Sequence, residues 1–308
     1  VDRLLIDPFP VPSPGASAVL LTGTSSGLGR HAALWLARDG YTVLATVRKA
    51  EDARLLAEAW QREKPLEKQL EKQTEKDSGG GDVVPIIMDV TSDESVAAAS
   101  AAVDALLEER RLDLAAIVNN AGVNANGGIL SAGGAVTSYE WNFGVNVFGV
   151  VRVTRQFLPA MKRGEKGGRV VNVGSVAGII AADKGSPYTA TKHAMEGMSD
   201  AWRRELAAEQ ISVSLIQPGF IASKMCNRKV CDDAYLPDFS KAVLHAVEDP
   251  YPQARYPVAG VVVMPAWLAV WFDALIPDRI ADAIINMVAK KSGINADTAG
   301  VSHMTTNL

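Results

Sequence analysis

The stretch AVLLTGTSSGLGR, residues 18–30, joins a short apolar run directly to a glycine-rich turn, after which a helical pattern begins. In such a strand–turn–helix unit, Gly23 permits a tight turn, Gly27 lets the backbone approach a pyrophosphate, and Gly29 lets the helix pack closely on the strand. The helix N-terminus presents free N–H groups and a positive dipole end to the anion. We expect a dinucleotide-binding turn made of Thr22, Gly23, Ser25, Ser26, Gly27, Leu28 and Gly29.

The same turn also matches a nucleophile elbow, because residues 23–27 read G-x-S-x-G with Ser25 at the centre. An elbow normally follows several strands of the sheet, whereas this turn follows the first strand. A serine hydrolase also needs a base, and none of the four histidines lies in a recognisable local motif: His31, His193, His245 and His303. Hydrolysis through Ser25 is therefore the less favoured alternative.

Strand-like and helix-like stretches alternate along the chain from residue 18. Six short runs rich in branched residues predict strands at 18–21, 42–47, 83–88, 115–119, 169–173 and 212–216. Apolar residues at helical spacing lie between these runs, so we expect right-handed βαβ units that form a parallel, doubly wound (Rossmann) sheet. The α/β fold forms a single domain over 18–308, preceded by an extended proline-rich arm at 1–17 and interrupted by a charged insertion at 61–82.

The composition is that of a globular chain without a basic surplus. Of 308 residues 48% are hydrophobic, and 31 Lys+Arg against 35 Asp+Glu give a net charge of −4, which disfavours nucleic-acid partners. Cys226 and Cys231 have no second pair and no histidine at ligand spacing, so neither a disulfide framework nor a metal site is expected. No run reaches the ~20 apolar residues of a transmembrane helix. We expect a cytoplasmic protein, with contact to a membrane surface left open.

Polar motifs follow the later strands at the edge where open α/β sheets bind ligands. NNAG occupies residues 119–122, Ser175 follows the fifth predicted strand, and YTATK occupies residues 188–192, while Asn146 lies in a helical stretch. Together with the TGxxxGxG turn, these motifs resemble the short-chain dehydrogenase/reductase family in the same order and at ordinary spacing. The resemblance covers residues 18 to about 223.

The resemblance implies an enzyme that transfers a hydride between a nicotinamide cofactor and a carbonyl or alcohol. It implies that Tyr188 is the acid/base, Lys192 its pKa modifier and ribose anchor, and Ser175 the holder of the substrate carbonyl. Asn146 would hold a water in the proton relay. A free phenol has a pKa of about 10, and a cation alongside favours the phenolate. We therefore expect Lys192 and the positive charge of the nicotinamide to lower the pKa of Tyr188 toward the operating pH.

The residues after the second predicted strand favour NADP(H). An NAD-selective enzyme of this type carries an acidic residue about 20 positions after the glycine turn, to bind the ribose hydroxyls. This chain has Val47, Arg48 and Lys49 there, and an arginine can instead hold the 2′-phosphate, which leaves NAD(H) as the alternative cofactor. The resemblance implies further cofactor contacts from Asp89, Val90, Asn120, Ala121 and Gly122.

The segment PGFIAS, residues 218–223, resembles the family's loop after the sixth strand, in which Pro218, Gly219, Ile221 and Ser223 would contact the carboxamide side of the cofactor. We expect a substrate lid and C-terminal region over 224–280. Residues 255–260 resemble the hydroxysteroid and retinol dehydrogenase branch, and Trp267 and Trp271 add an apolar concentration. These features suggest a small apolar substrate, a steroid-, retinoid- or lipid-like carbonyl or alcohol.

Two function classes remain: an oxidoreductase, and a non-catalytic relative that binds a dinucleotide as a redox sensor or scaffold. The complete set of Asn146, Ser175, Tyr188 and Lys192 favours the enzyme, because a sensor needs no proton relay. The expected helices near 140–161 and 188–208 are those that pair between subunits in the family that the chain resembles. The helix near 188–208 carries more apolar surface than one face of the sheet can cover. We therefore expect a homodimer or homotetramer.

Overall fold

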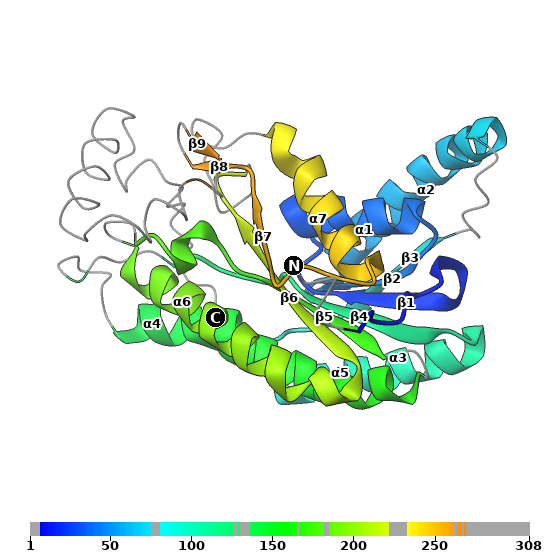
Figure 1. The fold of residues 1–308 in the computed structure, drawn as a ribbon. Coiled ribbons are helices and arrows are strands. Elements are labelled where there is room, and N and C mark those ends of the chain that lie inside the picture. Colours follow the sequence, from blue (N-terminus) through cyan, green and yellow to red (C-terminus); the bar gives the residue numbers. More distant parts are fainter. Residues whose placement is uncertain are drawn as a thin grey trace.

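The computed structural model describes residues 7–74, 81–125, 129, 136–164, 167–181, 185–221, 233–261, 264–265 and 268. Its centre is a seven-stranded parallel sheet in the order β3-β2-β1-β4-β5-β6-β7 (Figure 1). The strands are β1 (Ser17–Leu21), β2 (Thr42–Val47), β3 (Asp82–Ile87), β4 (Asp113–Asn119), β5 (Gly168–Val173), β6 (Ile211–Pro218) and β7 (Arg255–Val258). The strand order reverses between β1 and β4, which opens a crevice at their carboxyl ends. The predicted doubly wound Rossmann fold is confirmed.

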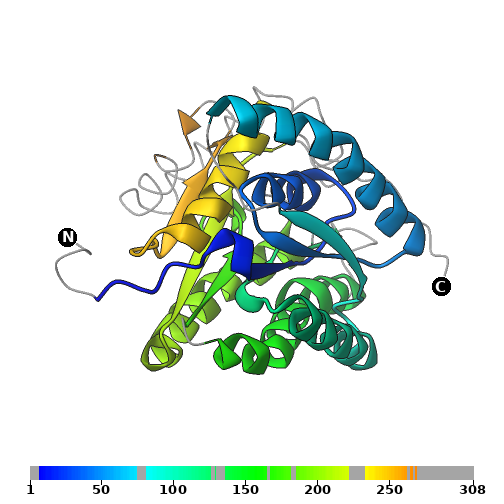
Figure 2. The same ribbon diagram turned by 90° about the vertical axis from the view of Figure 1, so that its right-hand side faces the viewer.

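Helices cover both faces of the sheet (Figures 1 and 2). One face carries α1 (Gly27–Arg38), α2 (Ala50–Thr74) and α7 (Leu236–Glu248). The other carries α3 (Asp93–Arg110), α4 (Val136–Phe143), α5 (Gly149–Arg163) and α6 (Ser186–Glu205). A π-helical turn, Gly144–Phe148, joins α4 to α5, and a short two-stranded ribbon pairs β8 (Gly260–Val261) with β9 (Met264–Pro265). Three-residue helical turns occur at Pro14–Ala16, Val176–Gly178, Ala207–Glu209 and Asp233–Tyr235.

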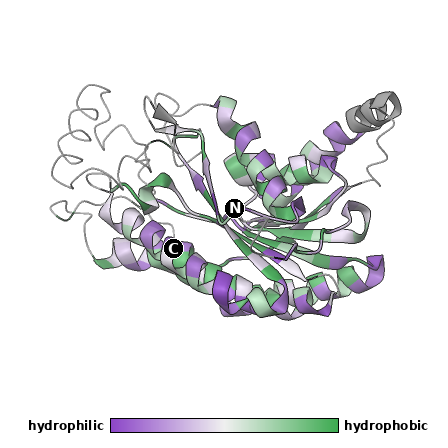
Figure 3. Ribbon diagram, in the orientation of Figure 1, coloured by the Kyte–Doolittle hydropathy of each residue, from purple (hydrophilic) through white to green (hydrophobic). Residues whose placement is uncertain are grey.

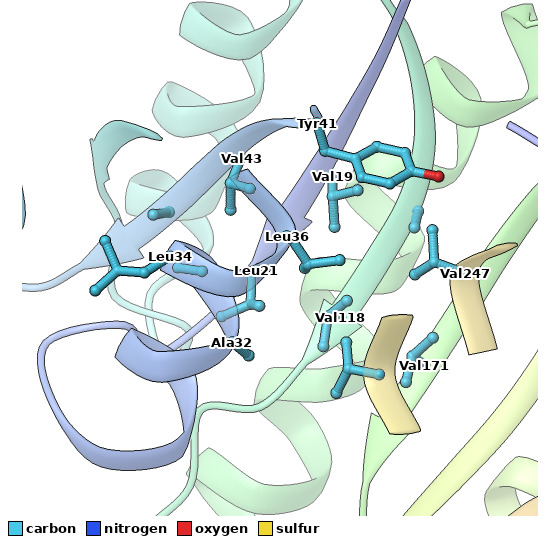
Figure 4. Packing of buried hydrophobic residues seen from close by; sticks show 14 of the residues in the cluster. Val19, Leu21, Ala32, Leu34, Leu36, Tyr41, Val43, Val118, Val171 and Val247 are labelled. Carbon is cyan, nitrogen blue, oxygen red and sulfur yellow. The ribbon is translucent and has the colours of Figure 1, made fainter. Parts of the chain in front are cut away.

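Alternate residues of each central strand enter two separate cores. Val19 and Leu21 of β1 pack under α1 and α7, together with Val171 of β5 (Figure 4). Ala18 and Leu20 point to the opposite face, into the core beneath α3 and α5. These four residues of β1 are fully buried, because helices cover both faces of a parallel sheet. The apolar residues accordingly lie along the strands and inner helix faces, and the polar residues lie outward (Figure 3).

The two edge strands of the sheet, β7 and β3, depart from the pattern of apolar residues that predicted the central strands. β7 is a seventh strand that the sequence pattern missed, because RYPV is only four residues long and contains a proline. At the opposite edge β3 includes Pro85, whose missing N–H is tolerated because β2 is the only neighbour of β3 in the sheet.

Residues 7–16 of the N-terminal arm are fastened to a buried arginine at the start of β5. Nη2 of Arg169 donates a hydrogen bond to the carbonyl of Pro10 (2.7 Å), and the Phe9 ring lies 5.4 Å from the guanidinium carbon. The amide of Phe9 also donates to the carbonyl of Pro250 (2.8 Å). Burial lowers the pKa of Arg169 to about 10, so the side chain keeps its charge at neutral pH. The arm thus binds across the amino edge of the sheet, opposite the carboxyl ends.

Several sequence-based expectations lie partly or wholly outside the described residues. The α2 helix runs through the first part of the charged insertion, as far as Thr74. The described part of the chain does not include Ser223, the two cysteines, Trp267 or Trp271. Of the lid and C-terminal region expected over 224–280, residues 224–232 and 269–280 also lie outside it. Among the described residues no helix is long and apolar enough to cross a membrane. Within that same part of the chain no cluster of three or more His, Cys, Asp or Glu side chains could hold a metal ion.

Candidate active site

The glycine turn after β1 is packed so tightly at Gly23 and Gly29 that neither position has room for a side chain. Gly23 has φ of +73°, and a Cβ there would lie 2.7 Å from the Cα of Ala121. A Cβ on Gly29 would lie 2.4 Å from the side-chain Nδ2 of Asn120 and 2.4 Å from the carbonyl oxygen of Gly23. The turn therefore needs glycine at these positions, for the reasons the sequence suggested: a left-handed turn and close helix packing.

Thr22 and Asn120 hold this turn against the end of β4. The Thr22 hydroxyl accepts hydrogen bonds from the backbone amides of Asn120 and Ala121, both at 2.9 Å. The Asn120 side chain donates to the carbonyls of Thr22 (2.8 Å) and Gly23 (3.2 Å). Both side chains were expected to contact the cofactor, and in the structure their polar groups shape the turn.

The residues present fit a dinucleotide pyrophosphate. Ser26, at the N-cap of α1, makes no side-chain hydrogen bond to the first turn of the helix, and Gly27 and Gly29 lie in that turn without side chains that would cover the backbone. The first-turn amides of a helix lack intrahelical partners and carry the positive end of the dipole. Leu28 packs against the core beneath α1, while Ser25 is partly exposed in the turn. This end of α1 could hold an anion through its backbone.

Two basic side chains lie exposed at the carboxyl end of β2. Arg48 and Lys49 follow the buried Val47, and Arg48 makes no ion pair with any residue that the structure describes. At the end of β3, one carboxylate oxygen of Asp89 accepts hydrogen bonds from the amide and hydroxyl of Thr91 (2.9 and 2.7 Å), and Val90 is buried. The Asp89 carboxylate is thus already held in place by its own loop.

Tyr188 and Lys192 lie one turn apart on α6, as their spacing predicted. The Lys192 ammonium is 5.5 Å from the centre of the Tyr188 ring and donates a hydrogen bond to the carbonyl of Val173, at the end of β5 (2.8 Å). Lys192 is buried, which lowers its pKa to about 8. Tyr188 is partly exposed as a residue, but its phenol is surrounded by protein.

In the cofactor-free protein the pKa of Tyr188 shifts upward, whereas from the sequence we expect Lys192 and a bound nicotinamide together to lower it. Burial raises the pKa of the phenol above its usual value, and a hydrogen bond with Ser175 offsets only part of that rise. In the cofactor-free protein the Lys192 ammonium, which binds the Val173 carbonyl and lies 5.5 Å from the ring centre, does not overcome this rise. At neutral pH the phenol of the cofactor-free protein is therefore protonated.

Ser175 is held at the mouth of the site between β5 and β6. Its hydroxyl accepts a hydrogen bond from the amide of Ala177 (3.1 Å) and lies 3.5 Å from the carbonyl of Pro218. Gly219, which follows Pro218, is packed against β8, and a Cβ on Gly219 would lie 2.3 Å from the carbonyl oxygen of Gly260. Ile221, two residues further along the chain, is buried. Ser175 and the loop after β6 thus border the same edge of the sheet.

Asn146 lies in the π-helical turn, where its side chain joins two other elements. Its Oδ1 accepts from the amide of Val123 (2.8 Å), and its Nδ2 donates to the Val123 carbonyl (2.9 Å) and to the Thr191 hydroxyl (3.1 Å). A Cβ on Gly122 would lie 3.3 Å from the Asn146 Oδ1, so glycine leaves room for this amide. Thr191 was missed by the sequence analysis, although it lies inside the YTATK motif.

A sequence profile described as short chain dehydrogenase matches residues 17–233. The chain belongs to the short-chain dehydrogenase family. An Escherichia coli protein named "Uncharacterized oxidoreductase YbbO" is 33% identical over 87% of this chain and 93% of its own length. The "3beta-hydroxysteroid dehydrogenase dhs-16" of Caenorhabditis elegans is 30% identical over 73% of this chain and 54% of its own length. This short-chain dehydrogenase is therefore an alcohol or carbonyl oxidoreductase with hydroxysteroid dehydrogenase-like relatives.

A solved structure agrees with the fold of this short-chain dehydrogenase. The Pseudomonas aeruginosa RhlG/NADP active-site complex superposes with a TM-score of 0.64 over 78% of this chain and 93% of that chain. The two sequences are 23% identical, so the likeness concerns the arrangement of the sheet and its helices.

Proposed function

We propose that this short-chain dehydrogenase interconverts apolar carbonyls and alcohols, such as steroid-, retinoid- or lipid-like compounds, with NADP(H). The observation that carries the proposal is the meeting of three groups at the carboxyl edge of the sheet. The Ser175 hydroxyl is near enough to the Tyr188 phenol to lower its pKa, and the Lys192 ammonium lies 5.5 Å from the centre of the Tyr188 ring. Such a group can deliver or accept a proton at a carbonyl oxygen.

In this mechanism the chain's own side chains handle the proton and the geometry. Ser175 donates a hydrogen bond to the substrate oxygen, and Tyr188 gives that oxygen a proton during reduction or removes it during oxidation. Lys192 would favour the deprotonated phenol and would bind the cofactor ribose. When bound, the nicotinamide cofactor supplies or accepts the hydride, which no side chain can provide. Asn146 holds the loop at Val123 beside α6. It would also hold a water in the proton relay that returns the proton to Tyr188.

The glycine turn and the end of β2 are the proposed cofactor site. The α1 backbone amides would hold the pyrophosphate, and Asp89 with Val90 would border the adenine. Asn120, Ala121 and Gly122 would line the crevice between β1 and β4, and Pro218, Gly219 and Ile221 would contact the carboxamide side of the cofactor. Arg48 would hold the 2′-phosphate as a planar fork, since this exposed guanidinium has no competing carboxylate among the residues described.

The cofactor assignment predicts that Arg48→Ala raises KM for NADP(H) and leaves KM for NAD(H) within about twofold. A charge-assisted contact of about 1.5 to 3 kcal/mol corresponds to roughly a tenfold to hundredfold loss. Adding Val47→Asp should reverse the preference, because a carboxylate accepts from ribose hydroxyls and repels a phosphate. The measurement is kcat/KM with both cofactors for the single and double variants. An unchanged ratio in the double variant would place the phosphate elsewhere.

Substrate class is tested by a panel of carbonyls and alcohols with NADPH and NADP+, followed at the nicotinamide absorbance band. Short polar ketones serve as the matched comparison for steroid, retinoid and long-chain ketones. Turnover that rises with apolar surface supports the proposed substrate class. Turnover confined to small polar ketones would contradict it.

We further propose a homodimer or homotetramer formed through the α4, α5 and α6 layer. Trp141 on α4, Phe148 in the π-helical turn and Val151 on α5 are 45%, 57% and 37% exposed. Burying such large apolar side chains against a second copy is favourable. Light scattering at micromolar concentration should give at least twice the chain mass. Trp141→Glu combined with Phe148→Glu should lower that mass, and a wild-type protein that stays monomeric would refute the proposed assembly.

A further inference from the structure

The hydroxyl of Thr191 lies where the π-helical turn meets α6. Its Oγ1 accepts a hydrogen bond from the Asn146 Nδ2 (3.1 Å) and donates one to the backbone carbonyl of Tyr188 (2.7 Å). Thr191 is fully buried, between Tyr188 three residues earlier and Lys192 directly after it. A single hydroxyl therefore connects Asn146 to the turn of helix that carries both the phenol and the ammonium.

The other hydrogen-bonding atoms of the Asn146 side-chain amide already bind Val123, so one of its N–H groups depends on the Thr191 hydroxyl. Its Oδ1 and one N–H are used by the amide and carbonyl of Val123, so the second N–H is directed at Thr191. Asn146 is buried, with 1% of its surface exposed. Loss of the Thr191 hydroxyl would leave that N–H without a partner, and a buried donor without a partner forces the surrounding groups to move.

We propose that Thr191 is a positioning residue, whose hydroxyl holds the first turns of α6 against Asn146 and so sets Tyr188 and Lys192 relative to the 120–123 loop. This inference rests on the proposed function, because it assumes that Tyr188 and Lys192 carry the chemistry. Thr191 itself touches neither the substrate nor the cofactor in this scheme. Small errors in the placement of an acid/base lower the rate of proton transfer more than they lower substrate binding.

Thr189 offers a matched control on the same helix. It is buried like Thr191 and lies two residues away, but its hydroxyl makes no hydrogen bond in the described part of the protein. Thr191→Val and Thr189→Val therefore remove the same group from the same helix in nearly isosteric fashion. Only Thr191→Val breaks the connection to Asn146, and Thr191→Ser restores it.

The test compares kcat, KM, cofactor affinity, melting temperature and the pH profile of kcat for these three variants. We expect Thr191→Val to lower kcat about tenfold while KM and cofactor Kd stay within about twofold. The pKa that limits kcat should rise in this variant, because the phenolate is less well supported by the ammonium. Thr191→Ser and Thr189→Val should both keep the wild-type kcat and pH profile.

Equal kcat for Thr191→Val and Thr189→Val would overturn the inference. So would a Thr191→Val defect that appears only as a lower melting temperature, since that marks a structural role alone. If Thr191→Val does not fold, Thr191→Cys makes the same comparison with Thr191→Ser, because a thiol is a weak hydrogen-bonding group.

Tyr188→Phe separates this inference from the proposed function on which it rests. If Tyr188→Phe keeps its turnover, the proposed function fails and the role of Thr191 fails with it. If Tyr188→Phe loses turnover while Thr191→Val does not, the proposed function stands and only the positioning role falls.

Discussion

Replacing Tyr188 with phenylalanine is expected to lower kcat about a thousandfold, within the range that general acid/base catalysis contributes. The substitution removes the transferable proton and keeps the ring, whose face lies towards the Lys192 ammonium. Cofactor affinity should stay within about threefold, because the helix and the lysine remain in place. Stopped-flow and steady-state assays of kcat, together with fluorescence titration of NADPH, measure the two effects separately.

Tyr139→Phe is the matched control for that experiment. The Tyr139 hydroxyl donates to Ser186 at the start of α6 (2.9 Å), in an exposed contact close to the site. Its loss should change kcat by no more than about twofold, since an exposed hydrogen bond contributes little. A Tyr188→Phe enzyme that retains more than a few per cent of wild-type kcat would contradict the acid/base assignment.

Replacing Lys192 with methionine is expected to weaken both catalysis and cofactor binding, with kcat/KM lower by about a hundredfold or more. One ammonium is proposed to hold the ribose and to support the phenolate, so both functions should be lost together. Methionine keeps most of the buried apolar volume of the stem. Loss of cofactor affinity with unchanged single-turnover rate, or the reverse, would mean that only one of the two roles belongs to Lys192.

The pH dependence of stability gives an independent check on Lys192 in the cofactor-free protein. Burial lowers its pKa in the folded protein to about 8, below its unfolded value, so the unfolded chain holds the proton more tightly. The Lys192 contribution to the free energy of unfolding therefore rises as the pH increases from about 8 toward the unfolded value. Lys192→Met lacks this contribution, so its stability relative to the wild type should fall over that window. Denaturant unfolding at several pH values measures the difference, and parallel pH profiles would contradict burial of a charged lysine.

The sequence predicted the fold well where its signals were local. Buried parallel strands are short runs of branched apolar residues, and six of the seven strands of the sheet were recognised in that way. β7 was missed because its four residues, RYPV, have no such pattern. It forms because β6 presents a free edge, onto which residues 255–258 pair in register.

The positions of the candidate site residues in the fold could be predicted where the signals were local, and their roles stay a prediction. Spacing alone placed Tyr188 and Lys192 on one helix face, and the glycine turn was recognised from the order of strand, glycines and helix. Thr191 could not be recognised, because its partner Asn146 is 45 residues away and joins it only when α6 packs beside the π-helical turn. The rise in the Tyr188 pKa could not be predicted either, because it is caused by burial of the phenol, which depends on the tertiary packing.

The sequence by itself determined the doubly wound sheet and its glycine turn, since each depends on neighbours within a few residues along the chain, and it supplied the hypothesis for the reactive side chains. Only the tertiary structure decided that the Lys192 ammonium binds the Val173 carbonyl, that Thr22 and Asn120 brace the glycine turn, and that Asn146 reaches Thr191. These contacts join residues distant in sequence. Buried polar groups must find partners once water is removed, and the packing of strands and helices decides which partners are within reach.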